Sequence, residues 1–251
     1  NPGALLIIDG SLVHNGSTPI NLNTGSGDLT INGYISGTGS ISCNATNTDI
    51  VVGGTTGDDA GTLKLDASSS LETMNNFSIT RSGATPNISL GSNATVNGVL
   101  SITTPAALAI KSNTLTITGT VTGTGTLSGS ASSNLTIAGT SGSVGTLYFT
   151  TGADSLNNFT ISRSGSGSKA TQGSSLVVAG AMDIVNSGSE FTLGNNTLTL
   201  SGTITGAGSL TGSSSSNLSI GGISGGSVGT LRFTTGSQTL NTFTLNRTNV
   251  G

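Results

Sequence analysis

The segment LTITGTVTGTGTLS, residues 115–128, decides the fold class of this chain. Its apolar residues Leu115 and Ile117 alternate with threonines, which is the two-residue period of a β-strand with one apolar and one polar face. Glycines follow at short intervals, and glycine favours the tight corners where a positive φ is needed. The segment therefore predicts short strands joined by turns, with leucine and isoleucine inside and threonine outside.

The same pattern returns as LTINGYISGTGSIS from Leu29 and as LTLSGTITGAGSLT from Leu198, at nearly equal distances on either side of Leu115. A second landmark appears as GTLKL, GTLYF and GTLRF. Its copies begin at the evenly spaced positions Gly61, Gly145 and Gly229. Because the two landmarks agree, the sequence contains a superrepeat of about 84 residues.

Within the superrepeat, apolar strand starts recur at intervals of about 20–22 residues. They fall at Leu115, Leu135, Leu156, Leu176 and Leu198. A coil of this length, with two or three short strands, is typical of a β-solenoid. We therefore expect an all-β, parallel β-helix of about twelve rungs, four to each superrepeat. It would run as one continuous solenoid through a partial repeat at 1–28, superrepeats at 29–114 and 115–197, and a partial superrepeat at 198–251.

A third landmark, NFSITR, NFTISR and TFTLNR, carries the largest predicted core residue of each superrepeat. The phenylalanines are Phe77, Phe159 and Phe243, and the arginines that close the segments are Arg81, Arg163 and Arg247. The arginines have two interpretations. Each is either a strand-end charge that hydrogen-bonds turn carbonyls, or a periodic surface contact for an anionic glycan or a neighbouring filament.

Composition and charge exclude several classes of partner. The chain has 251 residues, 40 of them glycine, with 7% charged residues and a net charge of -3. Its seven basic residues are scattered and form no patch for nucleic acid. No apolar run approaches the roughly 18 residues that span a bilayer. We therefore expect neither nucleic-acid binding nor membrane insertion. Cys43 is the single cysteine, so the chain cannot form an internal disulfide.

The sequence contains no cluster of catalytic residues. Polysaccharide-cleaving β-helix enzymes need several acidic side chains on one face, whereas the ten acidic residues here are scattered. Asp58 and Asp59 are adjacent, but the matching positions of the other copies carry no carboxylate. His14 is the only histidine. We therefore expect no catalytic, cofactor-binding or metal-binding residue, no cofactor, and no enzyme activity.

Outward threonines are the main exposed feature of the predicted solenoid. Thr116, Thr118 and Thr199 belong to Thr-x-Thr pairs and are candidate surface contacts. Flat solenoid faces with ordered threonine pairs resemble those of ice-binding proteins. Threonine is also a soluble β-former that suits any exposed strand. The pattern leaves an ice-binding or polysaccharide-binding face as an alternative function.

The segments TLTLSGTITGAGSLTGSSSSNLSIGG and GTLRFTTGSQTLNTFTLNRT, at 197–222 and 229–248, resemble repeats of very long cell-surface proteins of Bacteroidetes-type bacteria. Such proteins typically use type IX secretion, and some are adhesins or gliding-type filaments. The resemblance implies an extracellular location on the cell surface. We expect a structural and adhesive segment that acts as a stiff stalk. Its partners would be flanking repeats, laterally associated copies, and a glycan or other surface ligand.

Overall fold

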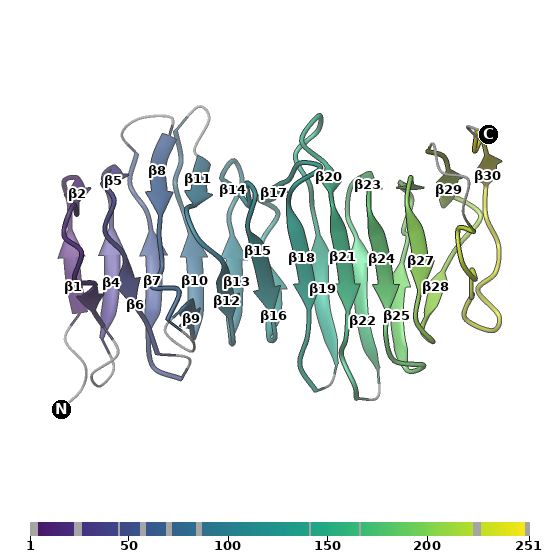
Figure 1. Cartoon of the computed structure of the whole chain (residues 1–251), viewed down its shortest axis with the longest axis horizontal. Coiled ribbons are helices and arrows are strands. Elements are labelled where there is room, and N and C mark those ends of the chain that lie inside the picture. The colour runs from purple at the N-terminus through teal and green to yellow at the C-terminus, as the bar shows by residue number, and fades with distance from the viewer. Residues whose placement is uncertain are drawn as a thin grey trace. The chain divides into compact units, whose positions relative to one another are not determined.

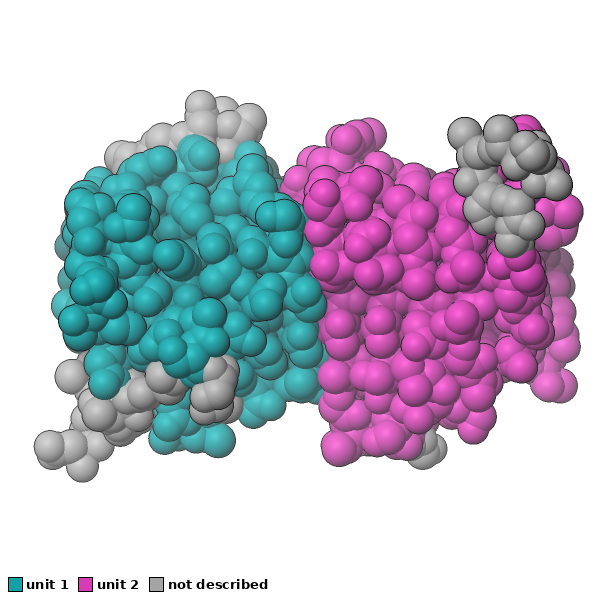
Figure 2. Space-filling view, in the orientation of Figure 1, with its two compact units in different colours: residues 1–127 teal, residues 128–251 magenta. Residues whose placement is uncertain are grey.

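The computed structural model describes residues 5–22, 27–44, 46–55, 59–68, 72–83, 87–140, 142–165, 167–222 and 227–248. These residues form short β-strands and no α-helix. None of them forms a helix long and apolar enough to cross a membrane. The chain divides into two compact units, residues 1–127 and 128–251 (Figure 2).

Unit 1 is a solenoid with three faces, each built from strands of successive turns (Figure 1). Its first face contains β1 (Leu5–Ile8), β4 (Asp28–Ile31), β7 (Asp49–Val52), β10 (Asn76–Ile79), β13 (Val99–Ile102) and β16 (Thr120–Thr122). Its second face contains β2 (Leu12–Val13), β5 (Ile35–Ser36), β8 (Asp59–Leu63), β11 (Asn87–Leu90), β14 (Ala107–Ala109) and β17 (Thr126–Ser128). Its third face holds β3 (Ile20–Asn21) with β6 (Ile41–Ser42), and β9 (Thr73–Met74) with β12 (Ala94–Val96) and β15 (Thr114–Ile117).

Unit 2 repeats this arrangement, and its strands belong to three sheets. One contains β18 (Asn134–Ile137), β21 (Asn158–Ile161), β24 (Ala181–Ile184) and β27 (Thr203–Thr205). The second contains β19 (Ser143–Leu147), β22 (Ser168–Gln172), β25 (Ser189–Thr192) and β28 (Ser209–Thr211). The third contains β20 (Ser155–Leu156), β23 (Leu176–Val178), β26 (Thr197–Leu200), β29 (Asn217–Ile220) and β30 (Thr242–Leu245).

Strands of successive turns pair in parallel, so the predicted β-solenoid is confirmed. The described residues form about 10 turns rather than the expected twelve. Turn length also varies more than expected, because the step from Ile50 to its partner Phe77 is clearly longer than the step from Leu29 to its partner Ile50. Loops at the corners absorb the extra residues, because only the short strand segments must remain in register.

The superrepeat does not contain a whole number of turns. One copy runs from β4 to β14, which is eleven strands, and β15 begins the next copy. With three faces to a turn, eleven strands make three and two-thirds turns. The homologous strands β4 and β15 therefore lie on different faces of unit 1, and β18 and β29 lie on different sheets of unit 2. The expectation of four rungs to each superrepeat is wrong.

Inward side chains form a continuous apolar stack in each unit. Phe77 lies between Ile50 and Leu100 of the neighbouring strands, and all three are fully buried. Phe159 is also fully buried and packs edge-to-face on Phe191, with ring centroids 5.1 Å apart. These two phenylalanines occupy the core positions that the sequence predicts for them.

The third phenylalanine does not fill a core position. Phe243 is 53% exposed, contrary to the sequence-based expectation. It lies on β30, which among the described strands pairs only with β29 and has no further turn against its other side. Phe243 is in register with the buried Leu218, so it still points inward. It is exposed because no described strand covers it from the other side.

The GTL landmark repeats because its glycine has a conformation that other residues rarely adopt. Gly61, Gly145 and Gly229 have φ values of 87°, 110° and 103°. A Cβ atom at Gly61 would collide with the carbonyl oxygen of Ile35, and one at Gly229 would collide with that of Ile204. The glycine therefore lets the backbone of one turn approach the turn before it.

The three homologous phenylalanines give a matched test of the core. We expect Phe159→Ala to lower the free energy of unfolding by about 3–5 kcal/mol, because it opens a cavity in a closed layer. Phe243→Ala removes a half-exposed ring and should change it by no more than about 1 kcal/mol. Urea denaturation of both variants checks the difference, and equal losses would contradict the burial pattern.

Two glycines with positive φ give a second test. Gly61→Ala combines a positive φ with a backbone collision, and we expect it to cost more than about 2 kcal/mol of unfolding free energy. Gly152→Ala is the control, since Gly152 has a φ of 78° but open space where a Cβ atom would lie. Thermal unfolding should show a clearly smaller loss for the control, and a similar loss in both variants would refute the close approach.

Candidate functional site

The recurring arginines are structural braces. Arg81 is 1% exposed, and its Nη1 donates to the carbonyl oxygens of Gly33 and Gly53, each at 2.9 Å. It continues the inward alternation of Phe77 and Ile79, so its side chain enters the solenoid after the strand has ended. This placement contradicts the interpretation of Arg81 as a surface contact and agrees with hydrogen bonding to turn carbonyls.

The other two arginines follow the same rule. Arg163 is 4% exposed and donates to the carbonyl oxygen of Ala138 at 2.7 Å, and burial lowers the pKa of its guanidinium. The interpretation of Arg163 as a surface contact is also wrong. Arg247 is half-buried and donates to the carbonyl oxygen of Gly202 at 2.9 Å.

The three candidate threonines are half-exposed, but each belongs to a different environment. Thr116 is in register with Thr95 of the neighbouring turn. Thr118 lies beyond the strand end, where its hydroxyl donates to the Asn97 side-chain oxygen at 2.9 Å. Thr199 lies between Val177 and Ser219.

The Thr-x-Thr pairs do not collect on one face of unit 1. The pair of β15 lies on the third face, and the pair of β16 lies on the first. This separation follows from the three-sided turn, because consecutive strands of the chain necessarily lie on consecutive faces. The repeated threonine motif therefore does not by itself build a flat two-column array.

Several acidic residues are engaged as structural acceptors. The Asp49 carboxylate accepts from the side-chain amides of Asn75 and Asn76, each at 2.9 Å, and Asn76 accepts from the backbone N–H of Val99 at 2.7 Å. Asp59 accepts from the backbone N–H of Gly61 at 2.8 Å, whereas Asp58 lies outside the described residues. These contacts link one turn to the next, or fix the backbone of β8 where its register with β11 shifts.

Asp66 has the same kind of role at a corner. It accepts from the side chain and backbone of Ser68 and from the Ser42 hydroxyl, and these bonds hold the pKa of its carboxyl below the ordinary value. Among the described residues, no three His, Cys, Asp or Glu side chains are grouped so that they could hold a metal ion.

One face of unit 2 carries an unbroken threonine column that the sequence analysis missed. Register aligns Thr146, Thr171, Thr192 and Thr211 on β19, β22, β25 and β28, and Thr234 follows in the next turn. Thr211 and Thr234 are joined by a hydroxyl hydrogen bond of 2.9 Å. The uneven sequence spacing of these threonines hides the column from a search at fixed period.

A second outward column runs beside the threonines on the same face. Lys169 is in register with Glu190, and Glu190 with Ser209. The pairing of Leu210 with Phe233 places Ser209 beside Arg232 of the next turn. A short side chain thus lies between two long ones of opposite charge, which are two strand spacings, or ~9.6 Å, apart along the column.

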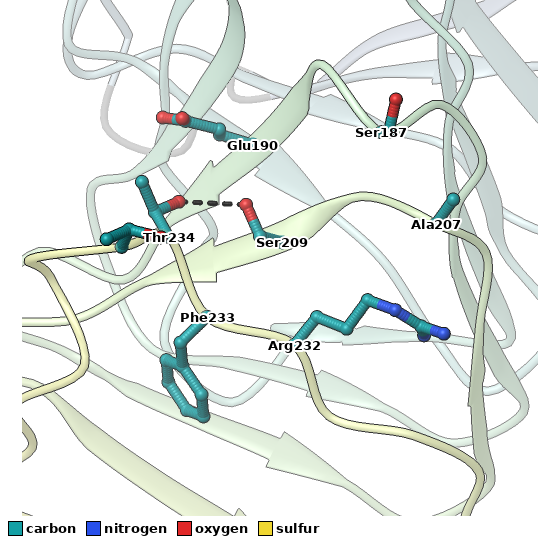
Figure 3. Close-up of a pocket in the computed structure, with 8 residues that line it drawn as sticks. Ser187, Glu190, Ala207, Ser209, Arg232, Phe233 and Thr234 are labelled. Atoms are coloured by element: carbon teal, nitrogen blue, oxygen red, sulfur yellow. Dashed lines mark hydrogen bonds between the residues drawn. The ribbon is translucent and has the colours of Figure 1, made fainter.

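This alternation of long and short side chains creates a surface hollow of about 530 Å³ (Figure 3). It is lined by Ser187, Glu190, Ala207, Ser209, Arg232, Phe233, Thr234 and Thr235. Figure 3 shows Glu190 and Arg232 at opposite sides with Ser209 between them, while the Phe233 ring points away from Glu190. The hollow is therefore bounded by carboxylate, guanidinium and hydroxyl groups, with Ala207 and Phe233 as its apolar members.

Polar groups of the hollow are partly fixed by the protein. Arg232 donates through Nη1 to the carbonyl oxygen of Gly206 at 3.0 Å, and Ser209 and Thr234 are hydrogen-bonded at 2.8 Å. Glu190 is approached by the Thr211 hydroxyl at 3.5 Å. The lining offers both donors and acceptors, so it suits a ligand that itself carries both.

Known proteins supply no site that could be carried over to this chain. No protein-family model, curated protein or solved structure matches it. The class of protein is set by the fold: a β-solenoid with apolar residues inside, small polar residues outside, and a polar hollow in unit 2.

The buried cysteine gives a pH-dependent test of the core. Burial raises the pKa of the Cys43 thiol from 9.0 to about 12. Between these pH values the unfolded chain releases a proton that the folded chain retains, so the free energy of unfolding falls as pH rises. The Cys43 contribution should be constant below pH 9 and fall above it by up to about 1.4 kcal/mol per pH unit.

Urea denaturation at pH 8 and pH 10.5 measures this fall, and the same experiment on Cys43→Ala separates the Cys43 contribution from every other pH effect. The variant should lose less stability between the two pH values. An identical loss in both proteins would show that the thiol is not desolvated in the folded state.

Proposed function

We propose that the chain is a structural segment of a long bacterial cell-surface protein, in which stacked turns act as a stiff stalk. The observation that carries the proposal is the register of each unit. Every turn is hydrogen-bonded in parallel to its neighbours and adds a layer to one apolar stack. In such an architecture each turn contacts mainly adjacent turns, so stability and length both grow with repeat number.

The use of the charged side chains supports a structural role. Arg81, Arg163 and Arg247 brace turn carbonyls, and Asp49 and Asp66 fix corners or link turns. Groups committed to these bonds hold the backbone at the places where the chain changes face. We accordingly propose a non-enzymatic protein.

An extracellular, cell-surface location agrees with the resemblance of residues 197–222 and 229–248 to repeats of Bacteroidetes-type surface proteins. Type IX secretion and an adhesive role follow from the same resemblance. The low content of charged residues, 7%, also leaves little repulsion between neighbouring molecules, which favours lateral association into a filament.

Ice binding is the second candidate, favoured by the five-threonine column of unit 2. The adjacent column carries Lys169, Glu190 and Arg232, so the face presents one row of threonines rather than paired rows. The stalk is therefore better supported. Thermal hysteresis of the purified chain, together with shaping of ice crystals, would favour the second candidate instead.

The stalk proposal predicts a relation between repeat number and fibre length on the cell. One superrepeat contributes three and two-thirds turns, or about 18 Å at the usual strand spacing. Removing or adding three superrepeats in the intact parent protein should shorten or lengthen its surface fibres by about 50 Å, as seen by electron microscopy. Fibres of unchanged length, or a short globular product released into the medium, would contradict the proposal.

A further inference from the structure

The geometry points to the hollow between Glu190 and Arg232 as a binding subsite for one ring of a neutral, extended glycan. The inference goes beyond the proposed stalk and does not depend on it, since it concerns only the outward side chains of one face. The site would allow that face to bind a ligand of defined chemistry, while the turns that carry it still add to the length of the stalk.

Register brings the charged and hydroxyl groups of the hollow together, and the turns at Ser187, Ala207 and Thr235 complete its rim. Glu190 on β25, Ser209 on β28 and Arg232 of the next turn follow one another in a single outward column. The pairing of β25 with β28 and the bridge from Leu210 to Phe233 set the spacing, so Glu190 and Arg232 are two strand spacings apart and the short serine leaves room between them. Glu190 and Ser209 lie on strands, which hold a site more rigidly than loops do, whereas Arg232 and the other lining residues lie in segments between or after the strands.

The chemistry of the lining selects for hydroxyl groups. A sugar hydroxyl donates one hydrogen bond and accepts others, which matches a carboxylate that only accepts, a guanidinium that only donates, and serine and threonine hydroxyls that do both. Glu190 and Arg232 offset each other's charge at the edge of the hollow. The lining therefore favours a neutral ring over an anionic one.

The threonine column extends the site beyond one ring. Thr234 borders the hollow, and Thr211, Thr192, Thr171 and Thr146 continue from it along the same face. The strand spacing of about 4.8 Å is comparable with the advance of one hexose ring along an extended glycan. Successive rings would thus meet successive hydroxyls, which favours a polymer over a free sugar.

Unit 1 contains an internal comparison that lacks the acid. Register places Pro19, Ser40 and Lys64 in the equivalent column, because Ile20 pairs with Ile41 and Ile41 with Leu65. Lys64 donates to the carbonyl oxygen of Thr38 at 2.9 Å, just as Arg232 donates to that of Gly206. Proline replaces glutamate, so the acceptor side of the hollow is missing.

The test is an NMR titration of the ¹⁵N-labelled full chain with neutral hexasaccharides of glucose, mannose and xylose. The three monosaccharides and hexagalacturonate are titrated separately, and glycine serves as a zwitterionic probe. We expect saturable shifts of residues 187–192, 207–211 and 232–235 with at least one neutral hexasaccharide. The corresponding monosaccharide should bind more weakly, and hexagalacturonate and glycine should not compete.

Two substitutions place the ligand in the hollow. Glu190→Gln keeps the shape but removes the charged acceptor, and should weaken binding about fivefold to tenfold. Ala207→Tyr fills the hollow from its exposed rim and should abolish binding. Thr38→Tyr, at the equivalent rim of unit 1, is the matched control and should leave affinity unchanged. Dispersed spectra confirm that each variant is folded.

Shifts by no neutral glycan would overturn the inference, as would equal binding by the Ala207→Tyr and Thr38→Tyr variants. Tighter binding of hexagalacturonate or glycine would show that the hollow recognises charge instead of hydroxyls. A monosaccharide that binds as tightly as its hexasaccharide would refute the polymer and the role of the threonine column. None of these outcomes bears on fibre length, so the stalk is tested separately.

Discussion

Parallel register between successive turns is the constraint on which the rest of this structure depends. Each strand must bring its inward side chains over those of the previous turn, as Phe77 does with Ile50, or the apolar stack is interrupted. Each corner must therefore place the start of the next strand in register with the previous turn. Positive-φ glycines such as Gly61 let neighbouring turns approach within the strands, and inward arginines such as Arg81 serve the corners, where strand hydrogen bonding stops.

The alternation of Leu115 and Ile117 with threonine was sufficient to predict strands, their inward faces and the solenoid class. The way in which turns stack was not predictable from it. Equal steps suggested that Leu135 stacks on Leu156, whereas its partner is Phe159. Strands of two or three residues cannot be delimited in the sequence. The leucine spacing therefore marks some strands and misses others. The result was four rungs to a superrepeat in place of three and two-thirds.

The same fractional turn explains which parts of the candidate site the sequence could reveal. Arg81 could have been assigned to the interior, because it continues the two-residue alternation of Phe77 and Ile79. The hollow could not, because Glu190 and Arg232 lie far apart in the sequence and become neighbours of Ser209 only through register. Homologous positions of the superrepeat lie on different faces, so a feature carried by each copy is distributed around the solenoid rather than aligned along it.

The most direct test of this account is disulfide trapping of the register in unit 2, with Cys43 replaced by alanine. Thr136 and Thr160 are in register on neighbouring strands, about 4.8 Å apart, a separation that a disulfide can bridge. Mild oxidation of the Thr136→Cys/Thr160→Cys variant should give an intramolecular disulfide, detected by mass spectrometry of tryptic peptides. The Thr136→Cys/Asn157→Cys variant, which tests the stacking of Leu135 on Leu156, should remain reduced. Efficient cross-linking of the second pair and not the first would contradict the account.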